Sequence, residues 1–102
     1  MTKKKSPSRK REPKYEEITV NDKRYILHKI TWEDITGDSG HANTTETKAM
    51  KPAIKITYGF IVEDNDKDLI TASTYDTKED EWSDRNVFPS GCVVAKKKLE
   101  IR

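Results

Sequence analysis

The chain of 102 residues has a single cysteine, Cys92, and lacks a long apolar run. One cysteine leaves no internal disulfide and no cysteine-based zinc site, which is typical of a protein in a reducing compartment. No stretch of about 18 apolar residues is present, and no apolar segment of a signal peptide. We therefore expect a cytoplasmic protein with no membrane partner.

Apolar residues are also scarce, at 32% of the chain against 37% charged residues. A chain of this length has room for one domain with a small core. Two Trp, four Tyr and two Phe supply much of the available apolar area, and they favour a folded domain over full disorder. No segment shows convincing helical periodicity, apart from one helical turn expected at 45–50 before Pro52.

Charge is divided unevenly along the chain. Residues 1–14 hold 7 of the 20 basic side chains and 1 of the 18 acids, a net of +6, which leaves 13 bases and 17 acids, a net of −4, for residues 15–102. The first segment has two prolines and no apolar residue after Met1. We therefore expect a disordered basic tail over 1–14 and a folded domain over 15–102.

Alternating apolar and polar residues predict β-strands in this domain. Ile18 and Val20 precede an Asn21-Asp22 pair that favours a tight turn. In the next strand Ile26, Ile30 and Trp32 share one face. The clearest alternation covers residues 54–63, and we expect its apolar set to line the interior: Ile54, Ile56, Tyr58, Phe60 and Val62.

The remaining strands are short and separated by polar turns. Turns at 64–67 and 77–81 flank an expected strand at 68–76, and a short run at 86–88 precedes a last strand at 92–101. The pattern predicts an all-β fold, either a small antiparallel β-barrel or a strongly curled sheet. The connection 35–53 is long for so small a domain, and connections of this length are often functional.

The segment Phe88-Pro89-Ser90-Gly91-Cys92-Val93 resembles the F-P-S-N-Y-V corner before the last strand of Src homology 3 domains. The resemblance implies a barrel of Src-homology-3 or Sm-like shape. It does not imply their proline-rich peptide groove, because Cys92 occupies the position of the groove tyrosine.

A longer resemblance covers roughly residues 24–101. Trp32-x-Asp34, the Gly37–Gly40 loop, Tyr58-Gly59-Phe60, Ser83-Asp84-Arg85 and Pro89-x-Gly91-Cys92-Val93 occur in this order. This layout is similar to short uncharacterised accessory proteins of tailed phages, in which a W-x-D strand precedes an S-D-x-x-x-x-P-x-G-C corner. The resemblance implies a small β-barrel and a viral accessory origin, without an assigned chemistry.

Two motifs imitate catalytic or metal sites. Gly37-Asp38-Ser39-Gly40 has the letters of a serine protease nucleophile, but that fold needs two barrels. Asp64-x-Asp66-x-Asp68 imitates the start of a calcium loop, but Leu69 and Tyr75 occupy the positions that require glycine and glutamate. We therefore expect a loop turn and a hairpin turn, and no enzyme, metal or cofactor.

Three binding hypotheses remain. The first is a macromolecular partner, such as a host protein that handles nucleic acid or acts in defence, held by the long loop and the 82–85 segment through Asp38, Ser39, His41, Trp82, Ser83, Asp84 and Arg85. In this hypothesis an acidic surface edged by Trp32 or Trp82 docks on a basic protein surface.

The second hypothesis is sequence-blind nucleic-acid binding through phosphate contacts. It uses the basic tail and the last strand, with the residues Lys3, Lys4, Lys5, Arg9, Lys10, Arg11, Lys14, Lys96, Lys97 and Lys98. The third is a pocket for a small ligand such as a nucleotide, built by Asp38, Ser39, Arg85 and Ser90.

Overall fold

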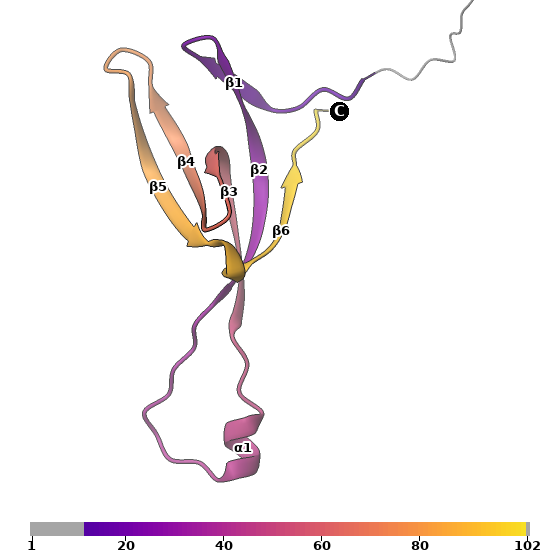
Figure 1. The fold of residues 1–102 in the computed structure, drawn as a ribbon, viewed down its shortest axis with the longest axis vertical. Coiled ribbons are helices and arrows are strands. Elements are labelled where there is room, and N and C mark those ends of the chain that lie inside the picture. The colour runs from indigo at the N-terminus through magenta and orange to yellow at the C-terminus, as the bar shows by residue number, and fades with distance from the viewer. Residues whose placement is uncertain (1–11, 102) are drawn as a thin grey trace, which may run out of the picture.

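A computed structural model describes residues 12–101 of the chain (Figure 1). The elements, in chain order, are the strands and helices β1 (Glu17–Val20), β2 (Lys23–Asp34), α1 (Thr44–Lys48), β3 (Ala53–Asp64), β4 (Asp68–Asp76), β5 (Glu81–Pro89), the 3-10 helix η1 (Ser90–Cys92) and β6 (Val93–Lys98).

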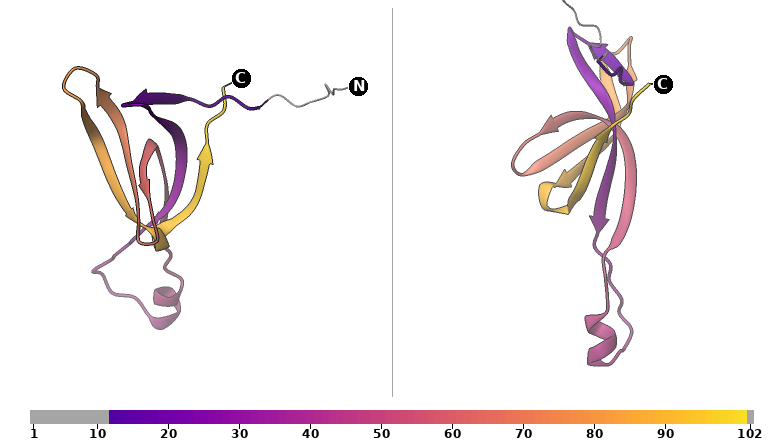
Figure 2. Two further views of the ribbon diagram at one scale, coloured as in Figure 1. Left: turned by 45° about the horizontal axis from the view of Figure 1, so that its top comes forward. Right: turned by 90° about the vertical axis from the view of Figure 1, so that its right-hand side faces the viewer.

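The strands form one antiparallel sheet in the order β1-β2-β3-β4-β5, with β6 paired to β2. β1 pairs with the first part of β2, and β6 pairs with its second part, from His28 to Trp32. Figure 2 shows the β3–β4 hairpin projecting away from β2 and β6. The predicted all-β fold with one curled antiparallel sheet is confirmed, and the sheet does not close into a barrel.

Short polar side chains build the predicted turns. Asn21 and Asp22 have φ angles of 50° and 68°, the left-handed pair that a two-residue hairpin turn requires. At the next hairpin, Asn65 Oδ1 accepts bonds from the backbone N–H groups of Lys67 and Asp68. Asp76 Oδ1 accepts from Lys78 and Glu79 in the same manner, and these bonds lower the pKa of Asp76. The Asp64–Asp68 segment is therefore a hairpin turn, as expected.

The core lies inside the curled sheet, between β2 and the β4–β5 hairpin. Its fully enclosed side chains are Ile30 on β2, Leu69 on β4 and Phe88 on β5. Three half-buried side chains pack against them: Trp32, Ile61 and Val93. The predicted inner face of β2, with Ile30 and Trp32, is therefore confirmed.

The predicted inner face of β3 is wrong, since Ile61 from the alternate set, and not the predicted set, packs against the core. Ile54, Ile56 and Tyr58 lie on the outer face, with 60%, 53% and 52% of their surfaces exposed. The pairing register explains the reversal, because Ile30 lies opposite Thr57 and paired residues share a face. With Ile30 inside, Thr57 is inside as well, and its neighbours Ile56 and Tyr58 must point out.

Gly59 allows β4 to approach β3 closely at this point. A Cβ atom on Gly59 would lie 3.1 Å from the Thr71 Cβ, closer than side chains normally approach. The missing side chain lets β4 pack directly on β3, and Thr71 is completely buried there. Strand alternation alone does not reveal where another strand packs closely, so it does not show which face of β3 becomes the interior.

A second, aromatic cluster lies between β2, β3 and the β4–β5 hairpin. The Trp82 ring lies 5.1 Å from Tyr25, 5.0 Å from Tyr75 and 6.3 Å from Phe60, measured between ring centroids. These four residues come from four different strands, β2 to β5. The cluster therefore fixes the β4–β5 hairpin against β2 and β3.

The long connection between β2 and β3 contains the helical turn expected from the sequence. Asn43 caps α1, since its side chain accepts from Glu46 N while Glu46 Oε1 accepts from Asn43 N. The helix buries no side chain. In Figure 1 this connection extends below the sheet, away from the β1–β2 and β4–β5 turns.

Candidate partner-binding site

The loop residues predicted to bind a partner all lie in this extension. Asp38, Ser39 and His41 are exposed. Asp38 Oδ1 accepts a bond of 2.8 Å from Gly40 N, which makes the expected glycine-rich turn. The loop therefore presents polar groups without enclosing them.

The 82–85 segment lies at the other end of the molecule. Trp82 is opposite Tyr75 in register, next to the β4–β5 turn, and that turn is remote from the β2–β3 connection (Figure 1). Asp84 accepts a bond of 2.7 Å from Thr74 Oγ1, while Ser83 and Arg85 are exposed on β5. The structure does not bring the loop and the 82–85 segment together.

The four residues considered for a nucleotide pocket are also apart. Asp38 and Ser39 belong to the loop, whereas Arg85 lies opposite Ala72 on β5. Ser90 is bonded to the β3–β4 turn, because its Oγ donates to the Asn65 carbonyl over 3.2 Å and its N–H to the Lys67 carbonyl over 2.8 Å. These side chains do not form one site.

Most of the predicted nucleic-acid residues lie outside the described residues: Lys3, Lys4, Lys5, Arg9, Lys10 and Arg11. Lys14, assigned to the tail from the sequence, is described, and its carbonyl accepts from Ile101 N over 2.8 Å. On β6, Lys96 forms an ion pair of 2.6 Å with Asp64. Lys98 covers the Tyr15 ring at 5.2 Å. Lys96 and Lys98 are therefore already engaged within the fold, whereas Lys97 lies opposite Lys29.

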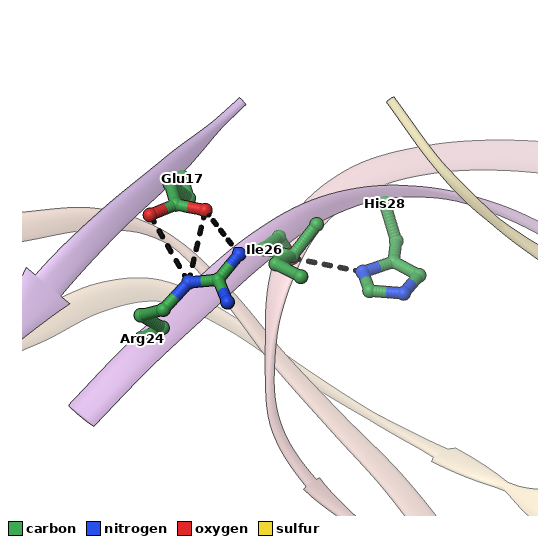
Figure 3. Close-up of polar contacts among 4 residues, drawn as sticks. All are labelled: Glu17, Arg24, Ile26 and His28. Carbon is green, nitrogen blue, oxygen red and sulfur yellow. Dashed lines mark hydrogen bonds and ion pairs between the residues drawn. The ribbon is translucent and has the colours of Figure 1, made fainter. Parts of the chain in front are cut away.

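The polar contacts near the start of β2 are structural (Figure 3). Arg24 donates to Glu17 through Nε and Nη2, over 3.1 and 2.6 Å, and these hydrogen bonds raise the pKa of Arg24. The Nδ1 atom of His28 lies 2.8 Å from the Ile26 carbonyl. His28 is therefore tied to its own strand, and Ser39 lies in the distant loop.

A hollow of about 220 Å³ lies where the end of β2 meets the end of β5 and η1. We call it the corner hollow. It is lined by Trp32, Glu33, Asp34, Ile35, Asn86, Val87, Phe88, Pro89 and Cys92.

The base of the corner hollow is rigid. Trp32 Nε1 donates to Thr57 Oγ1 over 2.9 Å, and the Trp32 ring meets the Phe88 ring edge-on at 5.1 Å. Phe88 belongs to the buried core. Two aromatic side chains are thus held in place before any partner arrives, which lowers the entropic cost of binding.

The rim of the corner hollow combines apolar and acidic groups. Val87 is 61% exposed and Ile35 89% exposed. Glu33 is exposed, and Asp34 forms an ion pair of 2.9 Å with Lys55. The sequence suggests an acidic surface edged by Trp32 or Trp82, and it does not reveal Val87 and Ile35, because single exposed apolar residues leave no periodic signal.

The hydrogen bond between Tyr75 and Asp80 at the β4–β5 turn should shift the titration of this tyrosine. The Tyr75 hydroxyl donates to Asp80, and this bond is the main cause that raises the Tyr75 pKa from 10.0 to about 12. The raised pKa in the folded state means that the bond stabilises the fold fully below pH 10.0 and loses this effect as the pH rises through about 12. Spectrophotometric titration of tyrosinate should show one late-titrating tyrosine.

Asp80→Asn should return the pKa of this tyrosine toward its ordinary value. Asparagine tolerates the positive φ that Asp80 adopts, so the turn should persist. Asp66→Asn, in the other hairpin turn, is the control and should leave the titration curve unchanged. Identical curves for Asp80→Asn and the unmodified protein would show that the bond does not form.

Comparison of the chain with protein-family models, with curated proteins and with solved structures gives no match. Within residues 12–101, no helix has the length and apolar character to span a membrane. The same residues hold no cluster of three or more side chains suited to a metal ion. A proposal for the function therefore rests on the geometry of residues 12–101.

Proposed function

We propose that the chain is a non-catalytic binding protein of the tailed-phage accessory type, and that it docks another protein at the corner hollow. The observation that carries the proposal is the exposed Val87 beside a fixed Trp32–Phe88 pair. Exposed apolar side chains next to a preformed aromatic base are typical of protein interfaces.

The charge at the rim supports a basic partner surface. Glu33 and Asp34 favour a surface that presents an apolar side chain flanked by lysine or arginine. Such basic surfaces occur on proteins that hold nucleic-acid phosphates. A host protein that handles nucleic acid is therefore the class of partner that fits the corner hollow.

Two valines provide a matched test. Val87 lines the hollow and Val94 lies on β6 outside it, with 61% and 58% of their surfaces exposed. Val87→Lys should remove at least tenfold of the affinity for a captured partner, because it places a cation beside the basic surface. Val94→Lys should leave the affinity unchanged. The measurement is capture from nuclease-treated bacterial lysate, followed by titration of the purified partner.

The test has clear contrary outcomes. A partner bound equally by Val87→Lys and by the unmodified protein would move the contact away from the corner hollow. Loss of every captured protein after nuclease treatment would instead support the second candidate function, sequence-blind nucleic-acid binding. That function is favoured by Lys97 lying opposite Lys29, since like charges on paired strands are unfavourable unless an anion lies between them.

A further inference from the structure

The first half of β3 has an open edge. Leu27 N–H donates to Glu16 O and Leu27 O accepts from Leu99 N, over 2.8 and 3.0 Å, so the backbone groups of Leu27 point away from β3. Its partner in register is Phe60. In such a non-hydrogen-bonded antiparallel pair, the backbone N–H and C=O groups of both residues point away from the partner strand. The direction repeats at every second residue, so the backbone groups of Tyr58, Ile56 and Ile54 also point away from β2.

An independent contact confirms this orientation. The Tyr58 carbonyl accepts a bond of 2.8 Å from Ser73 Oγ, on the side of β3 away from β2. β4 pairs with β3 only from Phe60 onward. Among the described residues, no partner is recorded for the outward backbone groups of Ile54 and Ile56.

This edge is apolar where the other edges are charged. Ile54, Ile56 and Tyr58 are all more than half exposed and belong to consecutive outward positions of one strand. The edge of β6 has Lys96, Lys97 and Lys98 instead, a usual guard against unwanted pairing. On β3 the one lysine between these residues, Lys55, is paired with Asp34 of its own chain, and an apolar edge of this kind is a template for a further strand.

We propose that β3 pairs with β3 of a second copy of this chain, antiparallel and across a two-fold axis at Ile56. This register is the one two-fold arrangement that pairs all three exposed apolar side chains. Ile56 faces Ile56 of the second copy, and Ile54 faces Tyr58. Aromatic and β-branched residues form favourable pairs across antiparallel strands, and a two-fold interface uses the same patch on both copies.

Charge supports the same register. It places Lys55 opposite Thr57 of the second copy, whereas a two-fold axis at Lys55 would place two lysines directly opposite each other. Glu33 flanks Ile54 and Lys29 flanks Tyr58 on β2. Across the new strand pair, the residues on the outer face therefore follow the order Glu33, Ile54, then Tyr58 and Lys29 of the second copy. An acidic end on one copy thus faces a basic end on the other, and no like charges meet.

The mass of the full chain in solution gives the first measurement. The unmodified protein should sediment at high micromolar concentration with a mass near twice 11.8 kDa. Ile56→Lys places two cations on the axis and should sediment as a monomer. Val94→Lys changes an equally exposed valine on β6 and should remain a dimer.

Disulfide trapping tests the register without relying on a disruptive variant. Residues on the axis would form a hydrogen-bonded pair with Cα atoms about 5.5 Å apart, a separation that a disulfide spans. In a Cys92→Ser background, Ile56→Cys should cross-link on mild oxidation and Val94→Cys should not. A monomer at all concentrations, a dimer that survives Ile56→Lys, or equal cross-linking of both cysteine variants would each overturn the proposal.

Discussion

Replacing Ile30 by alanine is expected to destabilise the folded domain by about 2–5 kcal/mol, the usual cost of deleting a fully enclosed aliphatic side chain. Ile30 has no exposed surface and packs with Leu69 and Phe88. A domain of this size has a total stability of only about 5–15 kcal/mol, so Ile30→Ala should lose a substantial part of it. Urea denaturation followed by tryptophan fluorescence measures the change.

Ile54→Ala is the matched control for this prediction. The residue type is the same and the strand is adjacent, but the Ile54 side chain is largely exposed. At a protein concentration low enough to keep the chain monomeric, its substitution should change the stability by about 0.5 kcal/mol or less. A loss at Ile54 as large as the loss at Ile30 would restore the inner face predicted from the sequence and contradict the structure.

Replacing Trp82 by alanine is expected to cost about 3 kcal/mol of stability, near the lower end for a buried aromatic residue, since Trp82 is only half-buried. The reason is the loss of ring contacts with Tyr25, Phe60 and Tyr75. These contacts hold the β4–β5 hairpin, so the hairpin should also exchange its amide hydrogens faster. Thermal unfolding and hydrogen exchange measure the two effects.

Trp82→Phe, which keeps an aromatic ring in the cluster, should recover much of the lost stability. Ser83→Ala changes the exposed neighbour and should be neutral. Full stability of Trp82→Ala combined with a lost partner would assign Trp82 the role predicted from the sequence, an anchor for binding. A destabilised variant with normal partner affinity per folded molecule supports the structural role.

Local features of the fold could be predicted from the sequence. The Asn21-Asp22 turn has the left-handed φ angles that these residue types tolerate. The corner at Phe88–Val93 forms the expected turn, with the 3-10 helix η1 inside it. Each of these features depends on a few neighbouring residues, so the local sequence contains the necessary information.

The faces of β3 could not be predicted in the same way. Ile54, Ile56 and Tyr58 have the alternation of an inner face, but the inside is decided by the pairing of Ile30 with Thr57. Both pieces of the pattern were visible, and only the register shows that they conflict. The close packing at Gly59 is equally non-local, because it requires Thr71 to approach from another strand.

The candidate site follows the same division. Whereas the sequence favours Trp82 as the anchor and Trp32 as a core residue, Glu33, Asp34 and Trp32 line the corner hollow together. Its other wall, Val87 and Pro89, comes from β5, more than 50 positions away in the sequence. The loop and the 82–85 segment were grouped by residue type, but the curl of the sheet places them at opposite ends (Figure 1).

Ile30 on β2 is buried, whereas Ile54 and Ile56 on β3 face outward. Nuclear Overhauser contacts between side chains test this assignment of faces most directly. The methyl groups of Ile30 should show contacts to Leu69 and to the ring of Phe88, as their packing requires. The methyl groups of Ile54 and Ile56 should show none to Phe88. Contacts from Ile54 or Ile56 to Phe88, with Ile30 lacking them, would contradict the fold, the corner hollow and the proposed dimer together.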